Sequence, residues 1–598
     1  MSKPITLRFK KRQKQLENPF KKDTLKTLWK HKVKSQVRSM SILDLHDFYD
    51  FHRRIDYNTS KINEQIISGQ YKSQIPIIYT LEKKFGICRH MIILSPSDTL
   101  ILQALIEPFC NDLEKQAPSN HAYYSRDKSS SIKLPHEINT DYNDWFEQWK
   151  IYQNEILQFT KTKKYIIITD LSNYFDSIRL NELRSVVSGY IKCDEVLLDL
   201  IFNIIEDLSW KPDYLPNQSI GMPTINLEAI RLLAHSFLFE IDYLLKYQIN
   251  ENFVRWMDDI VIGIDDIREA KSILSNISDV LKSRGLSLNM SKTKILDASE
   301  AKRHFLFDEN IQLNIFDKNP PKEKEFMKYF RRHWNKNKQY KNFDKVLKRF
   351  LTIAGNNNFT KILKYLPRIF EEYSDLRTNV CQYLYKLGYT KKTYKIFQSL
   401  INITRYDDIT LFLLVALIID WNIGYSRVDI ENINYISKYL KSLTIKDKEF
   451  NFYSYLWFAA KYETPKSIYE HINKYRNLWI KNSFLTRQVS SILFRLLPDL
   501  KDEYNDLRSF ILQRDYNDAS SVIYNMDEIR SCKNIHYLKE YLFPKNKHKK
   551  GYPLSKFLIL YNFCLENNKL NTLSIENKIK EHIQDKWYLF WLNKIKES

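Results

Sequence analysis

The spacing of apolar and polar positions changes near residue 320, which divides the chain into two parts of different expected structure. Between residues 60 and 310, short runs rich in β-branched residues alternate with stretches in which apolar residues recur every three or four positions. The short runs predict strands and the longer stretches predict helices, so this part is expected to be α+β. Strands are expected at "KYIIITDL" (164–171), on both sides of the Met257-Asp258-Asp259 turn, and over 75–94 as a hairpin that turns near Gly86. Helices are expected at 100–116 and 225–245.

A break separates this mixed part from the C-terminal half. It lies in "FDKNPPKEKE" (316–325), because Pro320 and Pro321 cannot lie inside a helix or a central strand. Residues 322–598 then give one amphipathic helical stretch after another, joined by short polar segments. This predicts an all-α region, either a helical bundle or an α-solenoid of degenerate repeats. We favour the solenoid, although the sequence has no clean period.

Charge and composition narrow the partners that the protein can have. The net charge of +22 and the isoelectric point near 9.3 favour a polyanion, either nucleic acid or an anionic membrane. Residues 1–40 hold thirteen Lys or Arg residues against two acids, so a basic N-terminal arm carries half of the excess. A solvated tail is the alternative interpretation of this arm. A mitochondrial presequence is disfavoured because Lys outnumbers Arg and no small-residue cleavage pattern follows.

Cysteine usage and hydropathy favour an intracellular protein. The six cysteines lie far apart without a C-x-x-C pair, which disfavours a zinc site or a disulfide framework and fits a reducing cytosol. The longest apolar run, "LFLLVALII" (411–419), has about half the length of a membrane span. We therefore expect no membrane association.

Acidic residues at two expected strand ends are the strongest indication of chemistry. Asp170 ends one apolar strand, and Asp258 with Asp259 occupies a hairpin turn between two others. Neighbouring strands lie about 4.8 Å apart, so carboxylates on two such ends can hold a pair of Mg²⁺ ions for nucleotidyl transfer. The cations would also relieve the repulsion between Asp258 and Asp259. A surface turn that happens to read Asp-Asp is the alternative.

Several motifs in series resemble those of reverse transcriptases, which weakens that alternative. "IIITDLSNYFDSI" (166–178) resembles their first catalytic motif, and "FVRWMDDIVI" (253–262) resembles the Tyr-x-Asp-Asp hairpin. The other matching segments, in the expected order, are "GICRHMIILSPSDTLILQALIEPF" (86–109), "SNHAYYSRD" (119–127), "GMPTINLEAIRLLAHSFLFEID" (221–242) and "GLSLNMSKTKIL" (285–296). The first two of these resemble the fingers of group II intron and retron enzymes. The resemblance covers about residues 70–310.

Departures from the common motifs point to a subgroup. Trp256 stands where Tyr is usual, and Gly-x-Pro-Thr-x-Asn-Leu (221–227) replaces the longer Pro-Gln-Gly motif. With the large helical C-terminal part, these features resemble the bacterial abortive-infection, or defence-associated, reverse transcriptases. The resemblance implies a right-hand fingers and palm polymerase over 61–317, following the basic arm at 1–60, and an all-α helical-repeat (HEAT-like) domain over 318–598. It also implies DNA synthesis without an ordinary template and, in some members, priming from a protein tyrosine.

The resemblance assigns roles to individual residues. Asp170 and Asp258 are the expected ligands of two Mg²⁺ ions (Mn²⁺ is an alternative), with the Leu171 carbonyl as a further ligand and Asp259 in a supporting catalytic role. Phe175 is expected beneath the incoming sugar, where its ring leaves no room for a 2′-hydroxyl; the alternative is a core phenylalanine. The remaining nucleotide-binding candidates are Arg89, Lys83 or Lys84 for the triphosphate, Lys292 for protonation of pyrophosphate, and Gly221 for close backbone approach.

Three segments outside these motifs carry weaker indications. "RRHWNKNKQYKNFDKVLKRF" (331–350) mixes basic and aromatic residues, as suits phosphate contacts and base stacking, or forms the basic face of a helix. "PKNKHKKGYP" (544–553) is expected to be a charged loop. Arg530 and His536 have the Arg-x5-His spacing of some helical ribonucleases, a match that chance also explains.

The sequence therefore predicts a nucleotidyltransferase, an RNA-directed or template-independent DNA polymerase, that acts in anti-phage defence in the bacterial cytoplasm. Its expected partners are dNTPs and the DNA product, while a non-coding RNA and a homo-oligomer stay open. One alternative is a retron-like or intron-like reverse transcriptase that copies a bound RNA. Another is an inactive polymerase fold that acts as a nucleic-acid or phage-protein sensor, which the intact Asp170, Asp258 and Asp259 disfavour.

Overall fold

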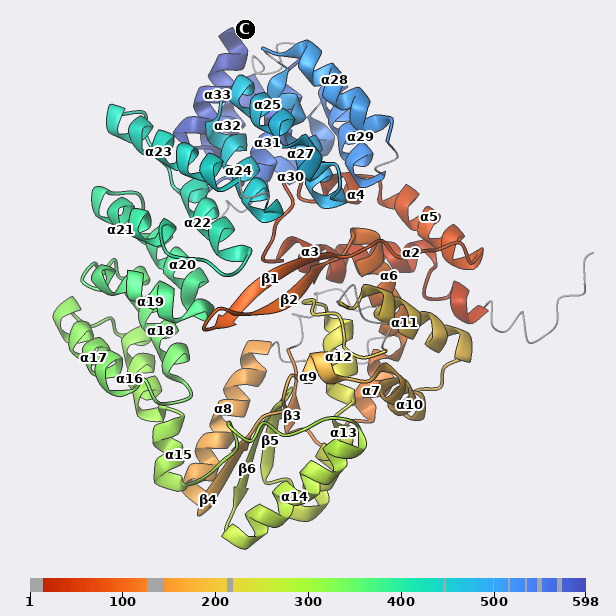
Figure 1. The fold of residues 1–598 in the computed structure, drawn as a ribbon, viewed down its shortest axis with the longest axis vertical. Helices are drawn as coiled ribbons and strands as arrows, with labels where there is room; N and C mark the ends of the chain where they lie inside the picture. The colour runs from red at the N-terminus through yellow and green to blue at the C-terminus, as the bar shows by residue number, and fades with distance from the viewer. Residues whose placement is uncertain are drawn as a thin grey trace, which may run out of the picture.

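Five strands form a mixed sheet at one end of the molecule (Figure 1). The structure is a computed structural model and describes residues 14–125, 145–211, 219–444, 448–497, 499–514, 517–532, 535–545, 551–566 and 573–597. The strand order is β3-β5-β6-β4-β7, and all neighbours are antiparallel except the parallel pair β3 and β5. The strands are β3 (Ala122–Tyr123), β4 (Tyr165–Thr169), β5 (Phe253–Trp256), β6 (Asp259–Ile264) and β7 (Lys294–Asp297).

The register of the central strands fixes where the chain turns. β4 lies between β6 and β7, and Thr169 at its end pairs with Ile260 of β6. Trp256 pairs with Asp259, which leaves Met257 and Asp258 as a two-residue turn between β5 and β6. Met257 has a φ of 53°, the left-handed conformation that tight hairpin turns favour. The predicted strand at 164–171 and the predicted hairpin around Asp258 are confirmed.

Both faces of the sheet are buried, and successive side chains of each strand enter different cores. Ile166 and Ile168 pack in one core with Tyr152 of α8 and Ala301 of α15. Ile167 belongs to the core on the opposite face, which α12, α13 and α14 help to build. These helices are α8 (Trp145–Thr162), α12 (Glu228–Ser236), α13 (Phe239–Ile249), α14 (Ile267–Ser283) and α15 (Ala298–His304). Burial on both faces explains why the β4 sequence is an unbroken apolar run.

A two-stranded hairpin lies between the sheet domain and the C-terminal helices (Figure 1). It consists of β1 (Ile77–Lys84) and β2 (Ile87–Ile93). Lys84 pairs with Ile87, so Phe85 and Gly86 form the turn, and both have positive φ. This confirms the hairpin predicted over 75–94 with its turn near Gly86.

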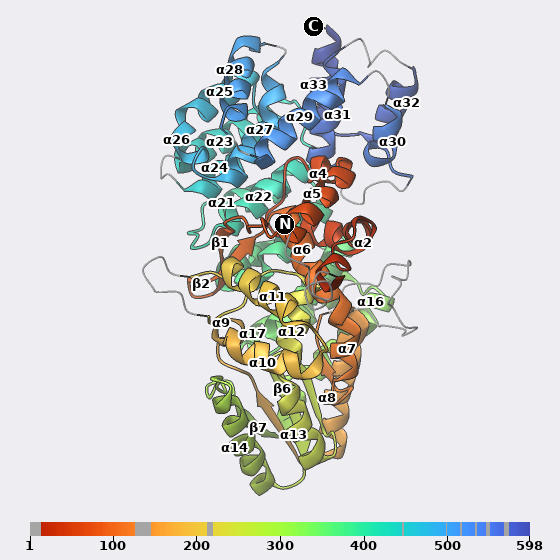
Figure 2. The same cartoon turned by 90° about the vertical axis from the view of Figure 1, so that its right-hand side faces the viewer.

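The C-terminal part of the described chain is a curved array of helices (Figures 1 and 2). Alternate helices pack in series, from α18 through α20, α22, α24, α27, α29 and α31 to α33. The array consists of α16 (Phe307–Lys318), α17 (Glu323–Lys336), α18 (Phe343–Asn356), α19 (Leu366–Glu372), α20 (Arg377–Leu387), α21 (Lys391–Ile401), α22 (Ile409–Asp420), α23 (Arg427–Thr444), α24 (Glu449–Tyr462), α25 (Pro465–Lys474), α26 (Arg476–Trp479), α27 (Ser483–Ile492), α28 (Lys501–Leu512), α29 (Asn517–Ser531), α30 (His536–Leu542), α31 (Leu554–Cys564), α32 (Leu573–His582) and α33 (Lys586–Glu597). The predicted all-α region is confirmed, whereas its assignment as HEAT-like stays a prediction.

The N-terminal segment is packed helix where the structure describes it, so the interpretation of residues 1–40 as a solvated tail is wrong for residues 14–40. Leu25, Leu28 and Trp29 are fully buried in the same core as α6. The elements are α2 (Lys22–Leu28), a π-helical turn (Trp29–Val33), α3 (Lys34–Arg38), α4 (Tyr49–Arg53), α5 (Ile55–Ile67) and α6 (Pro96–Ile106). The basic residues of this segment accompany an apolar helical face that packs on the part of the chain that contains the five-stranded sheet. Residues 1–13 of the predicted arm lie outside the described residues.

Two predicted helices are divided in the structure. The segment 100–116 breaks because Pro108 lies in a short 3₁₀ turn between α6 and α7 (Cys110–Lys115). The segment 225–245 contains α12 and the start of α13, separated by Phe237 and Leu238. The break predicted at Pro320 and Pro321 is confirmed, since α16 ends at Lys318 and α17 begins at Glu323. In the described part of the chain, no helix is long and apolar enough to cross a membrane.

Candidate active site

Three carboxylates meet where the central strands end. Asp170 directly follows β4, Asp258 lies in the β5–β6 turn, and Asp259 begins β6. Because β4 and β6 are hydrogen-bonded neighbours, their ends bring Asp170 and the Asp-Asp pair together, as the sequence predicted. The Asp170 side chain is almost completely buried, and its backbone carbonyl accepts a hydrogen bond from Asn289 N at 2.7 Å.

Asp258 is the carboxylate with the most unfavourable surroundings. Burial raises the pKa of its side chain to about 7, and the negative charges of Asp170 and Asp259 contribute in the same direction. Carboxylates this close need a proton or a cation among them. The turn therefore presents a group that is ready to exchange a proton for a metal ion near neutral pH.

The donor set of this turn fits Mg²⁺. Mg²⁺ prefers oxygen ligands and is commonly held by one or two carboxylates together with substrate phosphates and water. Asp170 and Asp258 supply two carboxylates. The residues that follow Asp170 are held beside the loop that precedes β7 by a hydrogen bond from Ser172 N to Ser287 O at 2.9 Å. Leu171 and Leu288 form an antiparallel β-bridge. Its hydrogen bonds are accepted by the carbonyls of Ser287 and Asp170, and not by the carbonyl of Leu171. Among the described residues, no group of three or more His, Cys, Asp or Glu side chains is arranged to hold a metal by itself.

Two lysines contact the outer carboxylates. Lys292, which precedes β7, donates a hydrogen bond to Asp170 Oδ2. Burial lowers the pKa of Lys292, but the hydrogen bond to Asp170 and the charges of the carboxylates raise it above its ordinary value. Lys341, from the loop between α17 and α18, places its Nζ 2.7 Å from Asp259 Oδ1. The helical array therefore contributes a charged group directly to the carboxylate cluster.

The carboxylates open into a cavity of about 660 Å³ that the sheet domain and the helical array share. Asp170, Asp258 and Asp259 lie on one side of it. Its basic lining residues are Lys83, Lys84, Lys292, Lys294, Lys338, Lys341 and Lys345. Such a concentration of lysines around carboxylates suits a polyphosphate that arrives with its own divalent cation.

Comparison with known proteins finds one family model that matches the part of the chain that holds this site. Residues 83–330 match the family model described as reverse transcriptase (RNA-dependent DNA polymerase). The chain contains a reverse transcriptase domain. The match indicates a nucleotidyltransferase of the RNA-directed DNA polymerase type, a family that acts on nucleotides and nucleic acid and generally uses divalent metals.

Solved structures with some similarity include two telomerases, each in complex with the TWJ fragment of telomeric RNA. The telomerase of Candida tropicalis is 12% identical with a TM-score of 0.28, and the match covers 64% of this chain and 68% of that one. The telomerase of Candida albicans is 11% identical with a TM-score of 0.28, and the match covers 62% of each chain. No curated protein matches the chain.

The structure brings some predicted nucleotide-binding residues to the cavity of the reverse transcriptase domain and leaves others outside its lining. Lys83 and Lys292 line the cavity, and the charges of the nearby Arg89 and Asp258 act on the pKa of Lys83. Burial lowers the pKa of Lys83, and the neighbouring Arg89 and Lys292 lower it further. Phe175, in α9 (Tyr174–Ser177), is half-buried against the core that contains Tyr174.

Gly221 lies beside α9, where it holds the turn that carries Phe175. Its N–H donates to Ile178 O at 2.8 Å, and the next N–H, of Met222, donates to Phe175 O at 2.9 Å. The φ of Gly221 is 93°, a conformation that a residue with a Cβ rarely adopts. The backbone that approaches Gly221 in this structure is therefore its own chain, and an approach by template or primer stays a prediction.

Arg255 is a supporting residue that the sequence analysis missed. Its side chain and that of Asp242 in α13 are both completely buried and form an ion pair. Arg255 Nη1 also donates to the carbonyl of Met257 at 2.9 Å, and Met257 N donates to Tyr123 O at 2.9 Å. Arg255 therefore anchors the turn that presents Asp258. The signal in the sequence that could have identified it is a charged residue inside an apolar strand, two residues before Met257.

Aromatic residues surround Trp256, the residue that replaces the usual Tyr. Its ring lies 5.1 Å from Trp149 and 5.8 Å from Tyr152, both on α8, and 6.2 Å from Tyr123 on β3. Trp256 therefore belongs to a packed aromatic cluster beside the Asp258 turn.

The remaining predicted segments differ in their outcome. Residues 331–350 supply Lys338, Lys341 and Lys345 to the cavity, which supports the prediction of phosphate contacts. Arg530 forms ion pairs with Asp527 and Glu566, as a structural residue of α29 would. The side chain of His536 and half of the predicted loop at 544–553 (residues 546–550) lie outside the described residues.

Proposed function

We propose that this protein is a DNA polymerase of the reverse transcriptase type that joins dNTPs by two-metal nucleotidyl transfer, with Mg²⁺ as the physiological ion. The observation that carries the proposal is the meeting of Asp170, Asp258 and Asp259 at adjacent strand ends, with the pKa of Asp258 raised to about 7 by burial and by the other two carboxylates. Divalent ions, when bound, would activate the attacking 3′-hydroxyl and stabilise the leaving pyrophosphate. Asp170 and Asp258 would hold them, with the Leu171 carbonyl as a further ligand.

The chain's own residues would orient the nucleotide around these carboxylates. Lys83, Lys292 and Lys341 approach the cavity from three different segments, so that they can contact a triphosphate from several sides. Lys292 is held in its charged form beside Asp170, which suits it to give a proton to pyrophosphate. Arg89 on β2 lies close to Lys83 on β1, so both strands of the hairpin would contribute to this basic side.

Incorporation of radiolabelled dNTPs by the purified full chain tests the proposal. We expect incorporation in Mg²⁺ or Mn²⁺, none after chelation with EDTA, and recovery when the metal is restored. Mg²⁺ should also raise the melting temperature of the protein, and more at pH 8 than at pH 6, because a proton on Asp258 competes with the metal below a pKa of about 7. Incorporation that persists without any divalent metal would contradict the proposal.

Lys341 gives a prediction about the contribution of the helical array. Lys341→Gln is expected to lower kcat/KM for dNTPs by roughly 10-fold to 100-fold, because a charge-assisted contact to phosphate is worth about 1.5–3 kcal/mol. Its half-exposed ion pair with Asp259 is worth at most about 1 kcal/mol of folding stability, so the protein should fold normally. Steady-state kinetics measure the effect, and Lys336→Gln, an exposed lysine on α17, is the matched control. Equal kinetics for both variants would show that Lys341 does not act on the nucleotide.

Phe175 gives a prediction about the sugar. Phe175→Ala is expected to increase the use of ribonucleotides relative to deoxyribonucleotides by about tenfold, because removing the ring makes room for a 2′-hydroxyl. Competition between rNTP and dNTP in one reaction measures this ratio. An unchanged ratio together with a lower melting temperature would assign Phe175 to the core that contains Tyr174.

For the biological role, we propose anti-phage defence of the abortive-infection type in the bacterial cytoplasm. The Gly-x-Pro-Thr-x-Asn-Leu motif and the long helical array (318–598 in the proposed division, after an arm at 1–60 and fingers and palm at 61–317) support it. Expression in a phage-sensitive bacterium should lower plaque formation, and Asp170→Asn should restore it. A reduction in plaque formation that persists in the Asp170→Asn variant would favour the sensor alternative.

Template and primer follow from the same resemblance and need a separate test. We propose untemplated synthesis primed by a tyrosine of the protein, without a commitment to a bound non-coding RNA or to a homo-oligomer. DNA attached to a tyrosine would survive boiling in detergent and be released with a short peptide by protease. Free product that copies a co-purifying RNA would instead favour the retron-like alternative.

A further inference from the structure

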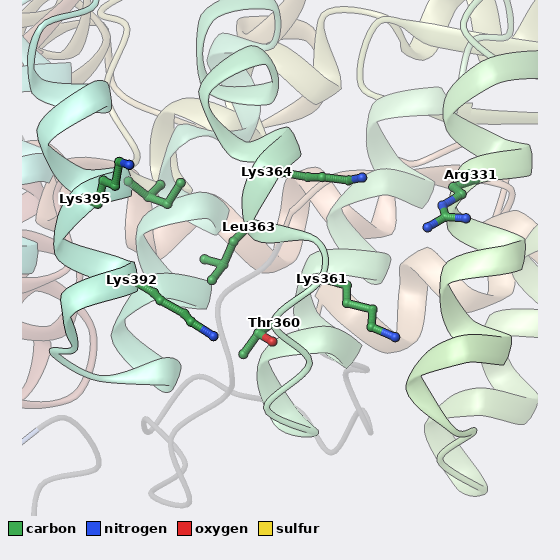
Figure 3. A pocket seen from close by; sticks show the side chains of 8 residues that line it. Arg331, Thr360, Lys361, Leu363, Lys364, Lys392 and Lys395 are labelled. Atoms are coloured by element: carbon green, nitrogen blue, oxygen red, sulfur yellow. The ribbon is translucent and has the colours of Figure 1, made fainter.

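A second basic groove lies on the helical array, lined by residues other than those of the catalytic cavity (Figure 3). It has a volume of about 490 Å³. Three elements build it: α17, the turn that precedes α19, and α21. The cationic residues that line it are Arg331, Lys361, Lys364, Lys392 and Lys395, with the apolar Leu363 among them.

The cationic side chains of this groove lack ion-pair partners among the described residues. All five cationic side chains belong to exposed residues. Within the described chain, none of the five forms an ion pair with a carboxylate, whereas neighbouring array residues such as Arg349 and Arg368 pair with Asp317 and Glu372. Five unpaired cations in one concavity attract a ligand that carries several negative charges in a row.

The arrangement of the lysines suits a strand that runs along the groove. Lys361 and Lys364 are three residues apart, and so are Lys392 and Lys395 on α21. In Figure 3, Lys361 and Lys364 extend toward the helix that carries Arg331, while Lys392 extends toward the turn from the other side. Phosphates can therefore be contacted from both walls. The half-buried Ile396, which lines the groove beside the buried Leu363, can face sugars and bases, which a single strand exposes and a duplex hides.

Helix α17 connects this groove to the catalytic cavity. Arg331 lines the groove, and Lys338, just beyond the C-terminus of α17, lines the cavity. The five residue steps from Arg331 to the end of α17 at Lys336 rise about 7.5 Å, a distance that a few nucleotides can span. Between the two, Lys338 lies over the ring of Trp334 at 4.3 Å. The cavity and the groove thus each have a basic residue at the end of this short segment, Lys338 (paired with Glu372) and Arg331.

We propose that this groove binds the single-stranded DNA product as it leaves the reverse transcriptase domain, through its phosphates. The origin of the strand rests on the proposed polymerase function, whereas the affinity of the groove for single-stranded polynucleotide does not. The groove holds the strand after each addition, so that more nucleotides are added before the product is released. It takes no part in the chemistry.

The test compares two full-length variants with the same change in net charge. The groove variant carries Lys361→Gln, Lys364→Gln, Lys392→Gln and Lys395→Gln. The control variant carries the same change at four exposed array lysines without an ion pair in the described structure, Lys438→Gln, Lys466→Gln, Lys481→Gln and Lys501→Gln. Binding of a fluorescent single-stranded oligothymidylate is measured by anisotropy over a range of salt concentrations, and product lengths are measured on gels.

We expect the groove variant to bind at least about tenfold more weakly at about 0.1 M salt and to lose about three units of the salt-dependence slope, because each lost phosphate contact removes about 0.7. The control variant should lose neither. The groove variant should add the first nucleotide at the normal rate and make shorter products. Binding is repeated in an Asp258→Asn background, so that a failure of the polymerase proposal does not affect this measurement. Equal binding by groove and control variants, or a preference of the groove for anionic phospholipid vesicles, would overturn the proposal.

Discussion

Asp258→Asn is expected to lower dNTP incorporation by roughly 10³-fold or more while the protein stays folded. The substitution keeps the shape of the side chain and removes a ligand that metal-assisted nucleotidyl transfer needs, and metal ions contribute several kcal/mol to such reactions. Single-turnover incorporation in Mg²⁺ measures the loss. Asp265→Asn is the matched control, because Asp265 follows the same strand β6 but is exposed and pairs with Lys163. Its activity should stay within about twofold of the unmodified protein, as expected for an exposed pair.

The Asp258→Asn variant should also be more stable than the unmodified protein when metal is absent. The pKa of Asp258 is raised to about 7 by burial and by Asp170 and Asp259, whereas an unfolded Asp ionises near its ordinary pKa. The folded protein therefore holds a proton that the unfolded chain has lost, and its stability falls as the pH rises from about 4 to about 7. Asn avoids this cost, so the gain in melting temperature should be large at pH 8 and small at pH 5. A folded Asp258→Asn protein with normal incorporation would remove Asp258 from the mechanism.

The parts of the site that the sequence predicted are those set by local pattern. The unbroken apolar run before Asp170 and the apolar runs on both sides of the Asp258 turn each favour a strand, and a strand end fixes where its last polar residue lies. Gly86 marked the tip of the β1–β2 hairpin for the same local reason. Family motifs then supplied the roles that such a pattern cannot give.

The parts that the sequence analysis missed depend on the path of the chain. Lys341 reaches Asp259 because α15, α16 and α17 carry the chain back to the sheet, and no local spacing encodes that return. Composition marked the segment 331–350 as basic and aromatic but could not say which lysine enters the cavity. At the N-terminus, the high density of basic residues concealed the helical spacing of Leu25, Leu28 and Trp29, which was present in the sequence.

Arg487→Met is the substitution with the largest expected effect on folding, because Arg487 joins the helical array to the N-terminal segment. Its guanidinium contacts Asp44 at 2.9 Å and Asp50 at 2.7 Å, and all three side chains are buried. Gln488 also reaches this segment, donating to Asp44 Oδ1 and accepting from Leu45 N. Removing one partner of a buried ion pair leaves an unpaired buried charge and costs about 3–5 kcal/mol.

Urea unfolding followed by tryptophan fluorescence measures this loss. Arg508→Met is the matched control, since its pair with Asp527 is partly exposed and is worth at most about 1 kcal/mol. Arg487→Lys should lie between the two, because it keeps the charge but cannot serve both carboxylates with a planar fork of donors. Equal unfolding midpoints for Arg487→Met and Arg508→Met would show that the array is held to the N-terminal segment by other contacts.

The pH dependence of the Arg487→Met effect separates a lost charge from lost packing. Burial alone would raise the pKa of Asp50, but the charge of Arg487 and its hydrogen bonds hold this pKa well below its ordinary value. In the unmodified protein the contribution of Asp50 is therefore fully present above about pH 4 and is lost in stronger acid. Without Arg487, burial dominates, the pKa of Asp50 rises, and the folded variant binds a proton that its unfolded chain releases. Its stability should then fall as the pH rises, so the difference from the unmodified protein should be greater at pH 8 than at pH 5. A difference that is the same at both pH values would mean that the packing of the Arg487 side chain, and not its charge, stabilises the junction.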